Sequence, residues 1–209
     1  MTTETETTKE LPTTDSLVPL DKYLAAGVHI GTQRKLKDME KYIYKIRSDG
    51  LSVLDVGVID KRIEAAATFL SKFKPEKVLV VCARDVGKKP AAKFAELIGA
   101  TAVTTRYMPG SMTNPSYSKY IEPDVLFIVD PGADKQAVRE ALNINIPIVS
   151  LCDTNNMTQN LDIIIPVNNK GKKSLALVFW LMAREVLKGQ GKIKKDEDYK
   201  VELKDFEEE

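Results

Sequence analysis

The chain has 209 residues, of which 43% are hydrophobic and 29% are charged, a composition typical of one globular domain and not of a wholly disordered chain. Its 31 Lys and Arg residues almost balance its 30 Asp and Glu residues, so the formal net charge is only +1. Taken as a bulk figure, this charge argues against nucleic acid or a membrane surface as a partner.

The ligating and apolar residues exclude further classes of protein. One histidine and two cysteines, Cys82 and Cys152, are too few for a four-ligand zinc site, so we expect no metal and no cofactor. Both cysteines lie in apolar segments, which predicts buried free thiols. The longest apolar run, Leu175 to Ala183, has nine residues, whereas a membrane helix needs roughly 20. With no signal peptide at its start, the chain is expected to be cytoplasmic and to make no membrane contact.

The first predicted elements are a short helix and a hairpin. Pro19 to Ala26 has a helical pattern, and Gly27 is placed to end it. Two strand-like segments, 42–46 and 51–56, flank Ser48-Asp49-Gly50, where the glycine can supply the positive φ that a hairpin turn requires. The sequence therefore predicts an N-terminal helix and a β-hairpin appended to the domain.

From residue 58 onward, predicted helices alternate with strands that are apolar throughout. The helices are 58–73, one that Pro90 opens and Gly99 ends, one with Asp134 as its candidate cap, and 174–187. The strands are 78–82, 101–104, 125–129, 147–151 and 163–165. Continuous apolar strands indicate a mostly parallel sheet that is buried on both faces. The predicted fold is α/β and doubly wound, with helices on both faces of the sheet.

The near-neutral total hides an uneven distribution of charge. Residues 1–16 hold one base and four acids, and residues 196–209 hold two bases and eight acids, so the two ends carry −3 and −6. Residues 17–195 hold 28 bases and 18 acids, a net of +10. We predict a disordered acidic N-terminal tail, a single basic α/β domain over 17–195 and a flexible acidic C-terminal tail. The charge of the body reverses the bulk argument and favours a polyanionic partner.

The alternative function is an enzyme, which would need a phosphate-binding loop. The segment 83–89 after the strand 78–82 is the candidate, because this fold class binds phosphates there. A Walker loop needs two glycines five apart, followed by Lys and a hydroxyl. Cys82 replaces the first glycine and Lys89 replaces the hydroxyl. The alternative function is thus an α/β nucleotide-binding or phosphotransfer enzyme with a degenerate phosphate loop. We expect no catalytic residue.

Three polar residues were the remaining candidates for catalysis. Asp130 and Asp153 each follow a strand, where catalytic carboxylates often lie, but aspartate is also an ordinary turn residue at such positions. His29 has no identifiable nucleophile beside it in the sequence, so a structural histidine is the safer interpretation.

Three basic clusters favour RNA or DNA over a small anion. In the first, cations at 34–47 interleave with Tyr42 and Tyr44, a mixture suited to phosphate contact and base stacking. The second, 168–173, precedes the last predicted helix, where lysines oppose the helix dipole unless a bound polyanion shares the site. The third, 188–195, reads as a flexible basic extension. A solvated surface is the alternative interpretation of each cluster.

Seven segments, taken together and in order, resemble the small-subunit ribosomal protein S2 family. They are AGVHIG (26–31), YIYKIRSDGLSVLD (42–55), RYMPGSMTNP (106–115), PDVLFIVDP (123–131), NIPIVSLCDTN (145–155), DIIIPVNNKGKKS (162–174) and LMAREVL (181–187). The resemblance implies a flavodoxin-like domain that binds small-subunit rRNA near the head–body junction, beside neighbouring small-subunit ribosomal proteins. It also implies a structural role in translation, on the cytoplasmic ribosome, without catalysis.

Two departures from the bacterial pattern indicate an archaeal or eukaryotic type. Thr32 stands where bacterial members carry a second histidine. The long helical-hairpin (coiled-coil) insertion of bacterial members has no room between the predicted hairpin at 42–56 and the helix that begins near Val58. Contacts made through that insertion are not expected here.

Basic clusters and resemblance together give two sets of candidate residues. The candidate RNA-binding residues are Arg34, Lys35, Lys37, Lys45, Arg47, Arg84, Lys88, Lys89, Arg106, Lys170, Lys172, Lys173, Lys192, Lys194 and Lys195. The candidate structural or docking residues are Gly27, His29, Gly31, Gly110, Asn114, Asp130 and Asp153. The resemblance makes the loop 106–114 RNA-facing or neighbour-facing, although residues of the second set can equally be folding determinants alone.

Overall fold

A five-stranded parallel sheet forms the centre of the computed structural model, which describes residues 16–194 and 198–207. Its strands, in the spatial order β4-β3-β5-β6-β7, are β3 (Val78–Val81), β4 (Thr101–Val103), β5 (Val125–Ile128), β6 (Ile148–Cys152) and β7 (Ile163–Pro166). The chain starts inside the sheet, adds one edge strand, then crosses back and adds three more, which is the flavodoxin-like order. The predicted doubly wound α/β fold is confirmed.

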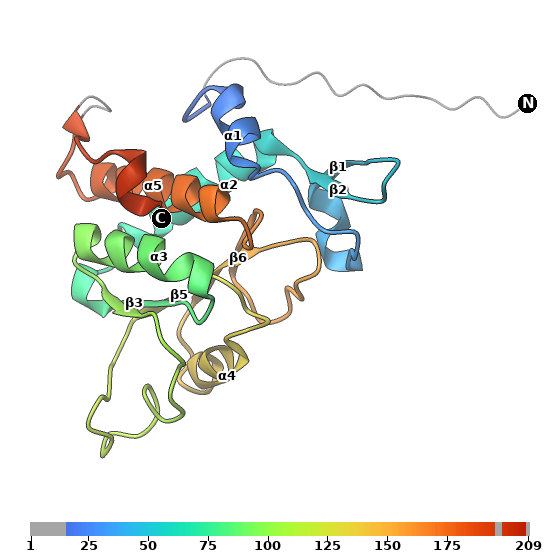
Figure 1. The fold of residues 1–209 in the computed structure, drawn as a ribbon. Coiled ribbons are helices and arrows are strands. Elements are labelled where there is room, and N and C mark those ends of the chain that lie inside the picture. The colour runs from blue at the N-terminus through green and yellow to red at the C-terminus, as the bar shows by residue number, and fades with distance from the viewer. Residues whose placement is uncertain (1–15, 195–197, 208–209) are drawn as a thin grey trace, which may run out of the picture.

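Helices cover both faces of the sheet, which explains why its inner strands are apolar throughout. One face packs against α2 (Val56–Leu70), α3 (Asp85–Ile98) and α5 (Lys172–Gly189), while α4 (Lys135–Asn143) packs against the other face (Figure 1). Successive residues of a strand pack into opposite layers of the core: Val80 packs on the three-helix side and Leu79 on the α4 side. The thiols of Cys82 and Cys152 are buried and free, as predicted, and burial raises the pKa of each to about 12.

The core of the larger layer is built around three phenylalanines. Phe94 of α3, Phe127 of β5 and Phe179 of α5 place their ring centroids 5.5–5.7 Å apart in tilted or edge-to-face pairs. Helix α5 is apolar nearly all round because α2 and α3 flank it. No helix in the described part of the chain is long and apolar enough to cross a membrane.

The N-terminal helix and hairpin form as predicted. Helix α1 (Leu20–Ala26) ends at Gly27, which has φ +69°, and the antiparallel strands β1 (Ile43–Ile46) and β2 (Ser52–Leu54) turn through Gly50 at φ +81°. A 3₁₀ turn, η1 (Lys37–Tyr42), leads into β1. The hairpin projects beyond the helical layer at one side of the molecule (Figure 1).

The junction between hairpin and helix leaves no room for an insertion. Helix α2 begins at Val56, two residues after β2 ends, and the Asp55 carboxylate caps it by accepting a hydrogen bond from the Gly57 N–H at 2.9 Å. The predicted absence of a long helical hairpin at this point is confirmed.

One helix start and one helix cap differ from the prediction. Helix α3 begins at Asp85 and carries Pro90 in its interior, so the expected start at Pro90 is wrong. Proline here removes only one hydrogen bond of the ladder, and its ring is buried in the core. Asp134 does precede α4, but its carboxylate accepts the Ala83 N–H at 3.1 Å and caps no α4 amide.

The C-terminal segment, residues 198–207, lies against α3 and α5 and ends in a 3₁₀ turn, η4 (Leu203–Phe206). Phe206 is fully buried, and the Trp180 indole of α5 donates a hydrogen bond to the Val201 carbonyl at 2.8 Å. The expected flexible tail therefore does not describe 198–207, because aromatic residues between its acids are buried. The N-terminal tail falls on residues outside the described part, and the domain boundaries stay predictions.

Replacing Phe206 by alanine tests the attachment of this segment. We expect Phe206→Ala to lower the free energy of unfolding by about 3 kcal/mol, since it removes a fully buried ring. Phe206→Leu should cost clearly less. The measurement is urea unfolding, and equal stability of both variants and the unaltered chain would show that the segment is a free tail.

Candidate nucleic-acid interface

Parallel strands end at one edge of the sheet, here called the carboxyl edge, and the loops after β3 to β7 meet there. Ligands of this fold class bind at this edge, at the point between β3 and β5 where the direction of winding reverses. Arg84 follows β3 and Asp130 follows β5, so the topology brings two of the predicted residues to that point.

The reversal point is filled by the protein's own side chains. The Arg84 guanidinium forms an ion pair with the buried Asp130 carboxylate, which also accepts hydrogen bonds from the Gly132 N–H and the Asn156 amide, each at 2.8 Å. A Cβ at Gly87 would lie 2.6 Å from the Cys82 sulfur, so the loop packs closely on the strand. The segment 83–89 is therefore the start of α3 packed against β3 and not an open phosphate loop, and its geometry does not favour the alternative of a nucleotide-binding enzyme.

A second buried carboxylate, Asp153, ends β6. The Lys170 ammonium, which follows β7, binds it at 2.9 Å and also donates to the Asn155 side-chain oxygen at 3.0 Å. The side-chain amide of Asn169 donates to Asn156 at 3.1 Å and to the Val129 carbonyl at 3.2 Å. Asp130 and Asp153 are therefore the centres of one polar network that ties the ends of four strands together.

The segment after Gly27 is held on this edge by hydrogen bonds. The Thr32 N–H donates to the Thr154 hydroxyl at 2.9 Å, and the Leu36 N–H donates to the Thr154 carbonyl at 3.0 Å. A Cβ at Gly31 would lie 2.6 Å from the Thr154 methyl group, so only glycine allows this approach. The interpretation of Gly31 as a structural residue follows from this contact.

His29 lies between α1 and the hairpin, where its carbonyl accepts the Leu54 N–H at 2.8 Å. Partial burial lowers the pKa of its imidazole, although a hydrogen bond to the Tyr23 carbonyl opposes the shift. Gly27, next to it, accepts the Asn168 side-chain amide at 3.2 Å. The described residues bring no group of three His, Cys, Asp or Glu side chains together that could hold a metal ion.

The loop 104–124 after β4 is anchored on one side chain of α4. The buried Glu140 carboxylate accepts hydrogen bonds from the Tyr107 hydroxyl and the Gly110 N–H at 2.8 Å, and from the Met112 N–H at 3.3 Å. Burial pushes the pKa of Glu140 upward, but these bonds, with one from Gln136, outweigh it and hold the pKa below its ordinary value. Nothing in the sequence around residue 140 pointed to this role.

Within that loop, the predicted residues have different surroundings. Arg106 is exposed, Gly110 has φ +90°, and Asn114 forms a turn in which its side chain accepts the Ser116 N–H at 3.1 Å. Asn114 therefore has a clear role in turn geometry, while Arg106 presents a charge to solvent.

The predicted cations fall into three spatial groups. Arg34, Lys35 and Lys37 are exposed on the segment bound to Thr154, and Lys45 and Arg47 are exposed on the hairpin. Lys172 and Lys173 are exposed in the first turn of α5, at the same carboxyl edge. Arg84 and Lys170 also lie there, but they neutralise buried aspartates.

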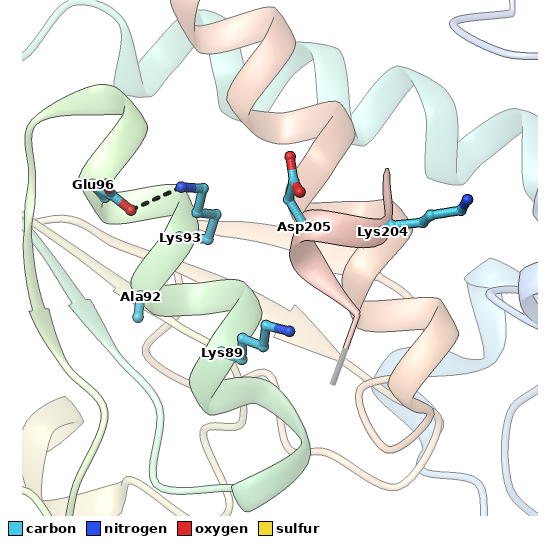
Figure 2. Close-up of a pocket in the computed structure, with 6 residues that line it drawn as sticks. All are labelled: Lys89, Ala92, Lys93, Glu96, Lys204 and Asp205. Carbon is cyan, nitrogen blue, oxygen red and sulfur yellow. Dashed lines mark hydrogen bonds and ion pairs between the residues drawn. The ribbon is translucent and has the colours of Figure 1, made fainter. Parts of the chain in front are cut away.

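Lys88 and Lys89 form the second group, on α3. Lys88 pairs with Asp85 at 2.6 Å, and Lys89 donates to the Glu207 carbonyl of the C-terminal segment at 2.5 Å. Figure 2 shows the hollow between α3 and η4 that Lys89 helps to line, with Lys93 paired to Glu96 and Asp205 on the facing turn. Both signs of charge line this hollow.

Lys192 and Lys194 lie apart from all the others. They follow the C-terminus of α5, a helix of 18 residues, and the Lys192 ammonium donates a hydrogen bond to the Ile98 carbonyl at the end of α3 at 3.4 Å. A helix of that length spans about 27 Å, so this group is at the opposite edge of the sheet. Lys195 lies outside the described residues.

Three cations that the sequence did not single out lie beside the predicted ones. Lys135 and Arg139 of α4 share a groove of about 390 Å³ with Arg34, and Lys22 of α1 shares another with Lys173. These pairs are more than 100 residues apart in the sequence, so no local pattern could have found them.

Replacing Glu140 by glutamine tests the anchor of the 104–124 loop. Hydrogen bonds to a charged group contribute about 1.5–3 kcal/mol, so Glu140→Gln should lower stability by that order and accelerate hydrogen exchange of the Gly110 and Met112 amides. Because the folded-state pKa lies below the ordinary 4.5, the advantage of the unaltered chain is complete above that pH and is lost as pH falls through the lowered pKa. Glu96→Gln, at an exposed position, is the control and should change neither measurement.

A family model described as ribosomal protein S2 matches the chain in two overlapping stretches, residues 23–121 and 116–189. The matched stretches run from α1 to the last residue of α5, which is well over half of the chain. They include the whole sheet, the hairpin and the polar network of the carboxyl edge.

Proposed function

The chain belongs to the ribosomal protein S2 family, and on this basis we propose that it binds small-subunit rRNA through the exposed cations of its carboxyl edge and hairpin. Family membership makes it a structural constituent of the small ribosomal subunit that acts in translation, in a family that is generally not enzymatic. Beyond family membership, we propose which surface of the protein binds the rRNA. We also propose that the protein lies near the head–body junction of the cytoplasmic ribosome, beside neighbouring small-subunit proteins.

The distribution of charge carries the proposal. Residues 17–195 have a net charge of +10, and exposed cations gather at one edge of the sheet and on the adjoining segment 34–47. Phosphate contact by such cations releases the counterions of RNA, which gives affinity without sequence readout. The fixed loops beneath them reduce the ordering that binding would otherwise require.

Two lysines in the first turn of α5 lie where a bound phosphate would be most stabilising. Lys172 and Lys173 lie at the positive end of an 18-residue helix, an arrangement that costs about 0.3–1 kcal/mol per exposed charge. A bound phosphate reverses the sign of this contribution, since the helix end and both lysines attract it.

Salt dependence of rRNA binding tests the proposal. Lys35→Gln with Lys37→Gln removes two cations next to the carboxyl edge, and Lys172→Gln with Lys173→Gln removes two from the start of α5. If each contacts a phosphate, the slope of log affinity against log salt should fall by roughly 1.4–1.8 in each double variant.

The matched control removes the same charge from the opposite edge. Lys192→Gln with Lys194→Gln should leave the slope unchanged, because these residues lie at the far end of α5. Filter binding with the cognate small-subunit rRNA over a range of salt concentrations gives all four slopes. Equal slopes in all variants and the unaltered chain would remove the carboxyl edge from the interface.

A further inference from the structure

Two tyrosines interleave with the cations of the 34–47 segment, and the structure separates them. The Tyr42 ring is 5% exposed, and the Lys41 ammonium and the Arg62 guanidinium lie 5.0 and 5.7 Å from its centroid. This ring is committed to the interior of the protein. Tyr44, two residues on, is 44% exposed and lies on the projecting hairpin.

Tyr44 occupies an irregular point of the β1–β2 ladder. Ile43 pairs with Leu54 and Lys45 pairs with Val53, so the register passes over Tyr44 and leaves it as the extra residue of a bulge. Bulges bend a strand and re-aim a side chain, and they recur next to functional sites.

The residues near Tyr44 in the sequence are mainly cationic. Lys45 follows it directly, and the Arg47 side chain is 56% exposed and makes a surface ion pair with Asp49 at 3.4 Å, of a kind that contributes little in water. Asp38 and Glu40 of η1 are exposed nearby, but six cations between Arg34 and Arg47 outnumber them. An aromatic ring beside alternating cations fits a nucleic-acid strand, which offers a phosphate at every nucleotide and a flat face on every base.

We propose that the Tyr44 ring is a stacking platform for an unpaired base of the bound RNA, with Lys45 and Arg47 holding the adjacent phosphates. This inference rests on the proposed rRNA binding and names the chemistry that one part of that surface recognises. Protein interfaces are enriched in tyrosine and arginine but depleted in lysine, and the segment 34–47 has four lysines against two arginines, so a protein partner is the alternative that the test must separate.

Graded substitutions of Tyr44 test the stacking. Tyr44→Ala should weaken binding to the cognate small-subunit rRNA, free of other proteins, by about 5- to 150-fold, the effect of losing one stacked base. Tyr44→Phe keeps the ring and should bind within about twofold of the unaltered chain, whereas Tyr44→Leu should lose most of the affinity. The salt slope should stay unchanged in all three, because none removes a charge.

Ile46→Ala is the matched control on the same strand, since Ile46 is also half-exposed but has no aromatic ring. It should leave RNA affinity unchanged. Chemical probing of the RNA gives an independent readout, in which one unpaired base protected by the unaltered chain becomes reactive with Tyr44→Ala.

Two outcomes would overturn the inference. One is equal weakening by Tyr44→Ala and Ile46→Ala. The other is full affinity of Tyr44→Ala for free rRNA, and if that variant also enters the particle poorly, the ring is assigned to a protein neighbour instead. Failure of the unaltered chain to bind rRNA at all would instead remove the proposed function, so the two failures are distinguishable.

Discussion

Two buried carboxylates at the ends of neighbouring strands set the constraint on which the rest of the structure depends. A carboxylate in the protein interior is costly unless it is paired and hydrogen-bonded. Arg84, after β3, neutralises Asp130, and Lys170, after β7, neutralises Asp153. The two counter-charges come from outside the β5–β6 pair, so satisfying them fixes the ends of four strands and closes the crevice in which this fold class binds small ligands. The same network that fills this crevice orders the carboxyl edge of the sheet.

The pairing of these two aspartates also determines which cations at the carboxyl edge are exposed to solvent. Arg84 and Lys170 are used internally, so the outward charge comes from cations on the segment bound to Thr154, on the hairpin and on α5. Glu140 fixes the neighbouring loop in the same way, with backbone N–H groups as the donors. Binding surfaces whose loops are already ordered pay less entropy on association. A rigid cationic edge beside a small projecting hairpin is a geometry suited to a large, folded polyanion.

Sequence patterns predicted the features whose signal is local. Glycines at the ends of α1 and α3 and continuous apolar runs identified the elements and the class of sheet, because each reports a backbone or burial requirement within a few residues. The role of Glu140 was not predictable, since most of its donors lie about 30 residues earlier and two of them are backbone N–H groups, which no residue type identifies. The grouping of Arg34 with Arg139 was hidden for the same reason. Counting charges in the sequence identified the basic clusters. It could not show that Arg84 and Lys170 pair with buried aspartates while other cations are exposed.

The C-terminal segment shows how charge and burial can point in different directions. Its acids suggested a solvated tail, yet Tyr199 and Phe206 are buried, and attachment through apolar area is insensitive to salt. The segment places Glu202 and Glu207 in the same groove as Lys173 of α5, and the Glu207 carbonyl accepts a hydrogen bond from the Lys89 ammonium. The acids of the segment therefore lower the positive potential around Lys173. The cations of the hairpin and of the Thr154-bound segment do not line this groove, so they are less affected.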